Sequence, residues 1–306
     1  MRFEAMLNRW WVYQRERFPI LGHGPLIVAF SASALCFSSL LRGRVALPDP
    51  RTAVIAFATS FLFFLQLRIA DEFKDYEEDA RYRPYRPVPR GLVTLGELGF
   101  VGVAGTLVQF ALALWLDPRL LLALLPVWLY LGLMTKEFFA REWLKARPFT
   151  YLWTHMLILP LIDFYATACD WLVAGAAPPR GLSWFLAASL CNGTVIEIGR
   201  KIRAPEDEEH GVETYSALWG RRNAALAWLG ALLLAMATSL LAATQVGSLA
   251  PLAALLALPL SAAALNAWQF LRRPATKHAR RFEAISGVWT LLMYVGLGGL
   301  PLALGQ

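Results

Sequence analysis

Three aspartates, Asp71, Asp75 and Asp79, follow the second long apolar stretch of the chain at intervals of four residues. On an α-helix such an interval turns the side chain by only about 40°, so the three carboxylates share one face. Carboxylates on one face can converge on hard divalent cations such as Mg2+. Guanidinium groups suited to phosphate oxygens come directly after them, at Arg81, Arg83, Arg86 and Arg90. The pattern predicts a polyanionic lipid substrate held through Mg2+ at a membrane surface.

The alternative for this segment is a solvated helix end whose carboxylates pair with Lys74 and Arg81. The intervening acids point elsewhere on the helix and are expected to be solvated. They are Glu72, Glu77 and Glu78. The run from Pro84 to Pro89 forbids helix and is expected to return the chain over the membrane mouth.

A second polar segment follows the sixth apolar stretch. Glu197 lies four residues before Lys201, so the two form either an ordinary helix pair or part of a site at membrane depth. Asp207 is the best candidate for a second metal anchor. Its neighbours Glu206, Glu208 and Glu209 are expected to form a solvated acidic rim. The cations Arg200, Lys201 and Arg203 are candidates for binding diphosphate oxygens or an anionic acceptor, with Glu197 as an acid or base.

The elements that position these residues are transmembrane helices. The chain is 57% apolar and only 17% charged, whereas soluble domains have about 45–50% apolar and about 25% charged residues. Spans need roughly 20 apolar residues each. The sequence predicts an all-α polytopic membrane protein of nine transmembrane helices, with spans near 20–41, 52–70, 97–116, 119–136, 150–173, 181–199, 223–245, 249–271 and 283–303.

The basic residues predict the orientation of these spans. With the N-terminus in the cytoplasm, every lysine and arginine falls on a cytoplasmic connection except Arg42, Arg44, Arg51, Arg119 and Arg180. The positive-inside rule therefore predicts a cytoplasmic N-terminus and an external C-terminus. The net charge of +7 then reflects topology and not nucleic-acid binding. The first residues are too charged for a cleavable signal peptide, and segment 1–19 is expected to lie at the headgroup level.

The chain is expected to form one domain over 1–306, with cytoplasmic cap loops at 71–96 and 200–222. The three cysteines, Cys36, Cys169 and Cys191, have no metal or redox spacing and are expected to serve as packing residues. Within the fifth span, His155 is placed near the cytoplasmic mouth and included in the candidate site. Asp163 lies deeper and is left out, because it could pair with Tyr165 or cap an irregularity after Pro160.

These residues resemble the UbiA superfamily of intramembrane prenyltransferases, which has nine transmembrane helices and two cytoplasmic aspartate-rich motifs. Asp71 aligns with the asparagine that opens the family's first motif, and Asp75 and Asp79 align with its later aspartates. The stretch Arg86-Pro87-Val88-Pro89-Arg90-Gly91 resembles the family's Arg-Pro-x-Pro-x-Gly. Gly211 and Thr214 align with the family's downstream Gly-x2-Thr, which places Asp207 on the second aspartate of the second motif. Tyr130 and Lys136 resemble its tyrosine and its diphosphate-contacting lysine.

One departure from the family pattern concerns the second motif. Arg203 stands where the family has the first aspartate, which weakens a metal site there and puts the usual aromatic acceptors in doubt. The candidate metal ligands are Asp71, Asp75, Asp79 and Asp207. The full candidate site adds Glu197 as a catalytic residue and, for substrate binding, Arg68, Lys74, Arg83, Arg86, Arg90, Tyr130, Lys136, His155, Arg200, Lys201 and Arg203.

The resemblance implies ionisation of an allylic isoprenyl diphosphate with Mg2+, followed by capture of the prenyl cation by an acceptor that the sequence does not identify. A terpene cyclase on the same scaffold is a second possibility, in which an internal double bond replaces the acceptor. A non-catalytic lipid-diphosphate carrier or transporter is a third, but its ionisable residues are expected at mid-membrane and not at one face. The expected location is a bacterial inner membrane, with the active site on its cytoplasmic side.

Overall fold

A computed structural model describes residues 2–305 of the chain, with the side chains of residues 7–305. All regular elements in these residues are helical, and helices α2 to α14 supply nine that are long and apolar enough to cross a membrane. The first half contains α1 (Arg2–Arg17), α2 (Ile20–Leu41), α3 (Pro50–Lys74), α4 (Tyr76–Tyr82), α5 (Leu95–Leu116), η1 (Pro118–Leu120), α6 (Leu121–Thr135), η2 (Glu137–Phe139) and α7 (Arg141–Lys145). The second half contains α8 (Pro148–Met156), α9 (Ile158–Trp171), α10 (Leu182–Arg200), η3 (Pro205–Asp207), α11 (Tyr215–Trp219), α12 (Arg221–Thr244), α13 (Leu249–Arg272) and α14 (Thr276–Leu304).

The nine predicted spans are confirmed, with small differences at their ends. The first candidate span is Ile20–Leu41, as predicted, whereas the last begins at Thr276 and not near 283. The fifth predicted span consists of two helices, α8 and α9, which meet at Leu157. The three cysteines are free and buried, as expected of packing residues.

Local sequence explains where the helices start. Asp49 caps α3 by accepting a hydrogen bond from the backbone N–H of Thr52, and Pro50 occupies the first turn, where no N–H donor is needed. Thr94 and Glu97 form a reciprocal capping box at the start of α5. Inner prolines such as Pro126 and Pro259 are accommodated within helices, as in other membrane proteins.

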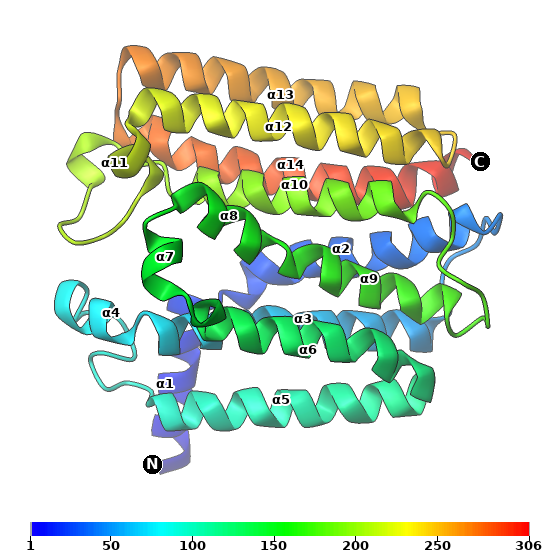
Figure 1. The fold of residues 1–306 in the computed structure, drawn as a ribbon, viewed down its shortest axis with the longest axis horizontal. Helices are drawn as coiled ribbons and strands as arrows, with labels where there is room; N and C mark the ends of the chain where they lie inside the picture. Colours follow the sequence, from blue (N-terminus) through cyan, green and yellow to red (C-terminus); the bar gives the residue numbers. More distant parts are fainter. Residues whose placement is uncertain (1, 306) are drawn as a thin grey trace.

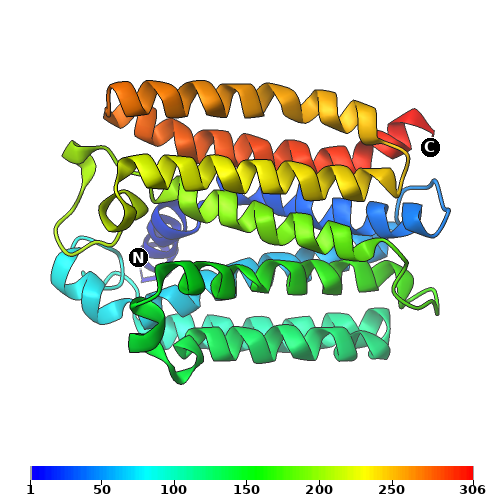
Figure 2. The ribbon, with the colours of Figure 1, turned by 45° about the horizontal axis from the view of Figure 1, so that its top comes forward.

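The helices pack as one bundle, with the short helices gathered at one end. Helix α10 packs against α9, α12 and α14, while α2 packs against α3, α9 and α14. Figure 1 shows α4, α7 and α11 at the end of the bundle where α1 lies, and the C-terminus at the opposite end. The turned view keeps the α4 and α11 regions side by side (Figure 2). This arrangement brings the two aspartate-rich segments, far apart in sequence, to the same mouth of the bundle.

Candidate functional site

The centre of the candidate site is the last turn of α3. The Asp71 carboxylate lies 3.0 Å from Nη2 of Arg68 and 3.4 Å from Nζ of Lys74. Arg200 and Lys201, at the end of α10, lie close enough for their charges to act on the same carboxylate. Asp71 therefore pairs with two cations of its own helix and feels the charge of two more from α10. Such a cluster can receive the oxygens of a diphosphate.

Asp75 has a different environment, although it is only one turn further along. Helix α3 ends at Lys74, Asp75 has φ −96° and ψ 5°, and α4 starts at Tyr76. Asp75 makes no ion pair with any side chain that the structure describes. Burial raises the pKa of the Asp75 carboxyl, and the charges of Asp71 and Asp79 raise it further. A cation placed beside Asp75 would favour its ionised form.

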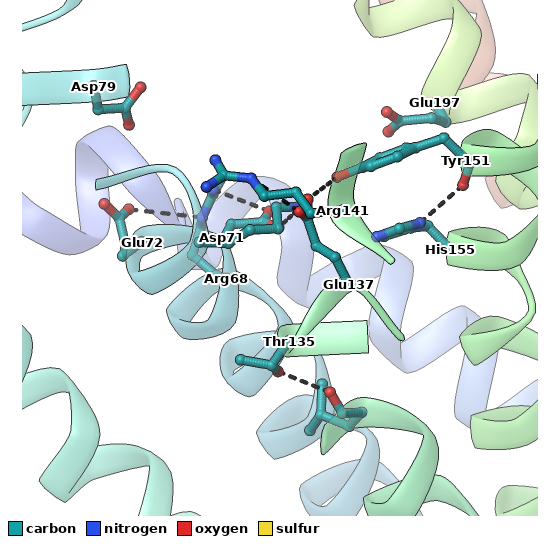
Figure 3. Close-up of polar contacts among 12 residues, drawn as sticks. Arg68, Asp71, Glu72, Asp79, Thr135, Glu137, Arg141, Tyr151, His155 and Glu197 are labelled. Atoms are coloured by element: carbon teal, nitrogen blue, oxygen red, sulfur yellow. Dashed lines mark hydrogen bonds and ion pairs between the residues drawn. The ribbon is translucent and has the colours of Figure 1, made fainter. Parts of the chain in front are cut away.

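The third aspartate of the ladder is turned away from this centre. Asp79 is buried and lies 2.5 Å from Nη1 of Arg86, 3.4 Å from Nη1 of Arg83 and 3.9 Å from Nη2 of Arg17. Figure 3 shows Asp79 well apart from Asp71. Because α3 ends at Lys74 and α4 begins at Tyr76, the three aspartates do not lie on one continuous helix.

Glu72 is buried, and the prediction that it is solvated is wrong. Its Oε1 lies 2.5 Å from Nε of Arg17, on the N-terminal helix, and 3.7 Å from Nε of Arg68. Burial is possible because both guanidiniums neutralise the carboxylate. We call this group the arginine clasp, made of Arg17, Arg68, Glu72, Asp79, Arg83 and Arg86. The clasp fastens α1 and the proline-rich turn to the end of α3.

The second polar segment keeps its predicted helix pair and adds another. Glu197 Oε1 lies 2.9 Å from Nζ of Lys201, and Oε2 lies 2.5 Å from Nη2 of Arg200. Glu197 is buried within α10, so both cations are held at the mouth of the bundle. This placement brings Glu197, Arg200 and Lys201 to the site that Asp71 occupies.

Asp207 lies in a different part of the loop. Its Oδ1 accepts a hydrogen bond from the Thr276 hydroxyl, 3.1 Å away, at the start of α14. The rim acids also have partners, because Glu206 accepts from Thr276 and Glu208 from Thr214. Asp207 thus ties the loop to α14.

Arg203 makes no ion pair in the described part of the chain. Its backbone N–H donates to Ser216 Oγ at 2.7 Å. The side chain lines a cavity of about 390 Å³ together with Ser216 and Arg221. Glu208 lines the same cavity. A cation therefore stands on the loop where an aspartate was expected.

Three further predicted residues make no ion pair with the aspartates of the site within residues 7–305. Tyr130 donates to the Thr154 carbonyl at 2.6 Å, and Lys136 is exposed. Arg90 pairs with Glu16 at 3.0 Å, so it fixes the proline-rich turn to α1 and does not reach the centre.

No group of three or more His, Cys, Asp or Glu side chains within the described residues is arranged to hold a metal ion. Two of the four predicted ligands still fit Mg2+. Asp71 and Asp75 are adjacent hard oxygen donors, and Mg2+ is commonly bound by one or two carboxylates plus substrate phosphates. The other two predicted ligands have partners elsewhere: Asp79 pairs with Arg83 and Arg86, and Asp207 accepts a hydrogen bond from Thr276.

Two residues of the site, Glu137 and Tyr151, were not found from the sequence. The Tyr151 hydroxyl donates to Glu137 Oε1 at 3.0 Å, and Nζ of Lys74 lies 5.5 Å from the centre of the Tyr151 ring. The same ring stacks on His155, with ring centres 4.0 Å apart (Figure 3). The available sequence signal was a glutamate, Glu137, directly after a predicted span. Its partner Tyr151 could not be predicted, because their contact depends on helix packing.

The segment that carries Glu137 has an unusual backbone. Glu137, Phe138 and Phe139 have φ values of 47°, 53° and 56°. This left-handed conformation costs roughly 1–2 kcal/mol for each residue with a Cβ atom. Residues held in this way are often found at functional sites. Here the conformation places Glu137 inside the site, where Arg141 Nε lies 3.1 Å from its Oε2.

The two cap loops contact each other above the site. Tyr85 donates to Glu209 Oε2 at 2.9 Å, and the Tyr82 ring lies beside His210. Gly211 has φ +77°, and a Cβ at this position would meet the Tyr82 ring at 2.4 Å. The glycine therefore allows the loops to close on one another.

We expect Gly211→Ala to destabilise the protein by about 1–3 kcal/mol more than Gly43→Ala, through overpacking against Tyr82. Gly43 is the matched control, because its φ is +74° but no atom lies within 4 Å of its Cβ position. Thermal unfolding in detergent and proteolysis of the 200–222 loop measure the difference. Equal effects of the two substitutions would show that the loops are not packed together.

Similarity to known proteins identifies the family and the fold of this chain. The model of the UbiA prenyltransferase family matches residues 32–294. No curated protein sequence matches the chain. Among solved structures, the apo structure of a UbiA homologue from Aeropyrum pernix K1 gives a TM-score of 0.68 at 18% identity, covering 89% of this chain and 96% of that one.

Two further structures share the fold. One, described as digeranylgeranylglyceryl phosphate synthase, gives a TM-score of 0.59 at 16% identity and covers 96% of this chain and 100% of that one. A UbiA homologue from Archaeoglobus fulgidus, bound to DMAPP and Mg2+, gives 0.52 at 12% identity, with coverage of 91% and 100%. Because the family model spans most of the sequence, the chain belongs to the UbiA prenyltransferase family, whose members are intramembrane prenyltransferases.

Proposed function

We propose that the protein is a Mg2+-dependent prenyltransferase that ionises an allylic isoprenyl diphosphate and transfers the prenyl group to an acceptor. The observation that carries the proposal is the convergence of Asp71 and Asp75 with cations of α3 and α10 at one mouth of the bundle. A homologue of the same fold binds DMAPP and Mg2+. The basic connections support a cytoplasmic location for this mouth.

Cations from two helices would hold the diphosphate. Arg68 and Lys74 approach from α3, and Arg200 and Lys201 approach from α10. Glu197 keeps the last two in place before substrate arrives. Mg2+ held by Asp71 and Asp75 would supply further positive charge to stabilise the departing diphosphate. Fixed charges of this kind lower the barrier, because they are already oriented when the negative charge develops.

The proposal is tested by incubating purified protein with geranylgeranyl, geranyl or dimethylallyl diphosphate, with and without Mg2+. We expect Mg2+-dependent release of diphosphate, and a prenylated product when an acceptor is supplied. Mass spectrometry distinguishes the outcomes. A cyclic hydrocarbon formed without acceptor would identify a cyclase. Intact diphosphate under all conditions would contradict an enzymatic role.

Arg203 provides a prediction about the altered second motif. If it neutralises part of the diphosphate, Arg203→Asp should weaken donor binding about tenfold, because reversal of charge adds repulsion without completing a metal shell. Donor affinity is measured by competition with a labelled diphosphate. Arg203→Ala is the control, since it removes the cation and adds no carboxylate. Unchanged donor affinity in Arg203→Asp would show that Arg203 is a surface residue. If Arg203→Ala loses only the acceptor-dependent product, Arg203 belongs to the acceptor pocket.

A further inference from the structure

His155 has one ring nitrogen with a partner and one without. Nδ1 lies 2.8 Å from the Tyr151 carbonyl oxygen. A carbonyl only accepts hydrogen bonds, so Nδ1 must be the donor, and in the neutral ring Nε2 carries the lone pair. The side chain is 7% exposed, and Nε2 is buried without a hydrogen-bond partner among the described residues. Native proteins rarely leave a buried acceptor unsatisfied, and Nε2 is free to accept a hydrogen bond from a bound molecule.

The position of this nitrogen connects it with the diphosphate site. The His155 ring is stacked on the Tyr151 ring with an interplanar angle of 9°. The Tyr151 ring also contacts Nζ of Lys74. The Tyr151 hydroxyl is fixed in turn by Glu137. Figure 3 shows the His155, Tyr151 and Glu137 side chains on the side of the site that faces Asp71. The free nitrogen is thus held in a set orientation by a side chain that also contacts Lys74 of the proposed diphosphate site.

Phe138 covers His155. Its ring meets the imidazole edge-on, with centres 6.0 Å apart, and it lies in the left-handed Glu137–Phe139 segment. A segment held in a sparsely populated backbone conformation, such as Glu137–Phe139, stores strain that is released when the segment relaxes. Displacement of Phe138 by an entering acceptor would expose Nε2 to that acceptor.

We propose, on the basis of the function proposed above, that His155 is the catalytic base that takes the proton of a hydroxyl acceptor. The acceptor oxygen forms a bond to C1 of the allylic group. The bond from C1 to the diphosphate oxygen breaks, and its electron pair leaves with the diphosphate. The hydroxyl proton moves to Nε2, and the resulting imidazolium later returns it to water.

The charges around His155 favour a hydroxyl over other nucleophiles. The charges of Lys74 and Asp71 on α3 and of Glu197 on α10 act on the imidazole. Tyr151, on the same helix as His155, accepts its hydrogen bond, and the Tyr151 hydroxyl in turn donates to Glu137. Asp71 and Glu197 are each paired with two cations, so neither carboxylate is free to bind an ammonium group. A carbon nucleophile offers no O–H or N–H donor to satisfy Nε2.

The test uses geranylgeranyl diphosphate with Mg2+, and water as the probe nucleophile. We expect His155→Ala to lower prenol formation by at least about 10²-fold, with donor affinity unchanged. Added imidazole should restore most of the lost rate by filling the space left by the side chain. His278→Ala is the matched control, because His278 is equally buried and also has an unpartnered ring nitrogen, but lies at the start of α14. That variant should keep its rate and not respond to imidazole.

The same assay measures the acceptor class with ethanol and ethylamine at equal concentration. We expect the geranylgeranyl ethyl ether to form in a His155-dependent reaction and the amine adduct to be minor. Predominance of the amine adduct would overturn the assignment to hydroxyl acceptors. If His155→Ala is unstable, His155→Gln preserves the size of the side chain and should show the same loss of rate.

Failure of this inference differs from failure of the proposed function. Wild-type protein that releases diphosphate, together with a folded His155 variant that is equally active or is not rescued by imidazole, overturns the role of His155 alone. Wild-type protein that releases no diphosphate overturns both.

Discussion

Asp75→Asn is expected to lower Mg2+-dependent diphosphate release by about 10³-fold, which is at the upper end of the effect of removing one preorganised electrostatic group from an active site. Asparagine keeps the shape of the side chain but removes the charge that Mg2+ requires. Of the three spaced aspartates, Asp75 is the one without an ion-pair partner among the described residues. Burial raises its pKa, so a bound cation would favour the ionised form. The rate is measured by release of diphosphate from geranylgeranyl diphosphate, and EDTA should abolish it in the wild type.

Glu77→Gln is the matched control for this substitution. Glu77 is exposed and lies two residues away on the first turn of α4, so its loss should leave the rate nearly unchanged. Near-wild-type turnover in a folded Asp75→Asn protein would exclude Asp75 as a metal ligand and favour a structural role for the acidic segment.

Glu72→Ala is expected to destabilise the protein by about 3–5 kcal/mol, because it leaves buried guanidinium charges without their carboxylate. The Arg17 and Glu72 side chains are only 9% and 1% exposed. The loss should appear as a lower unfolding temperature in detergent. Proteases should also cut earlier between α1 and α2, because Arg17 no longer holds α1 to the end of α3.

Glu77→Ala serves as the control here and should change stability by less than about 0.5 kcal/mol, as is usual at exposed positions. The double variant Arg17→Ala/Glu72→Ala should lose less stability than the sum of the two single variants, since the pair is removed together. Additive losses would show that the contact between Arg17 and Glu72 contributes nothing to the clasp.

The sequence by itself determined the nine helices and the mouth at which the polar residues meet. A span is recognised from about 20 consecutive apolar residues, and its ends from local caps such as Asp49 and Thr94, so neither depends on distant parts of the chain. The same is true of the Glu197–Lys201 pair, which one helix alone can form. Alternation of basic connections then places the two polar segments on one side of the membrane.

Tertiary structure decided which carboxylates are free for chemistry. Spacing by four predicted one face for Asp71, Asp75 and Asp79; in the structure α3 ends before Asp75, and Asp79 pairs with Arg86 of the arginine clasp. Glu72 is buried only because Arg17 arrives from α1, and Glu137 joins Tyr151 only because η2 and α8 meet. The energy of a charged group depends on the partners that packing brings within a few ångströms. Sequence spacing fixes such partners within a helix but not between helices.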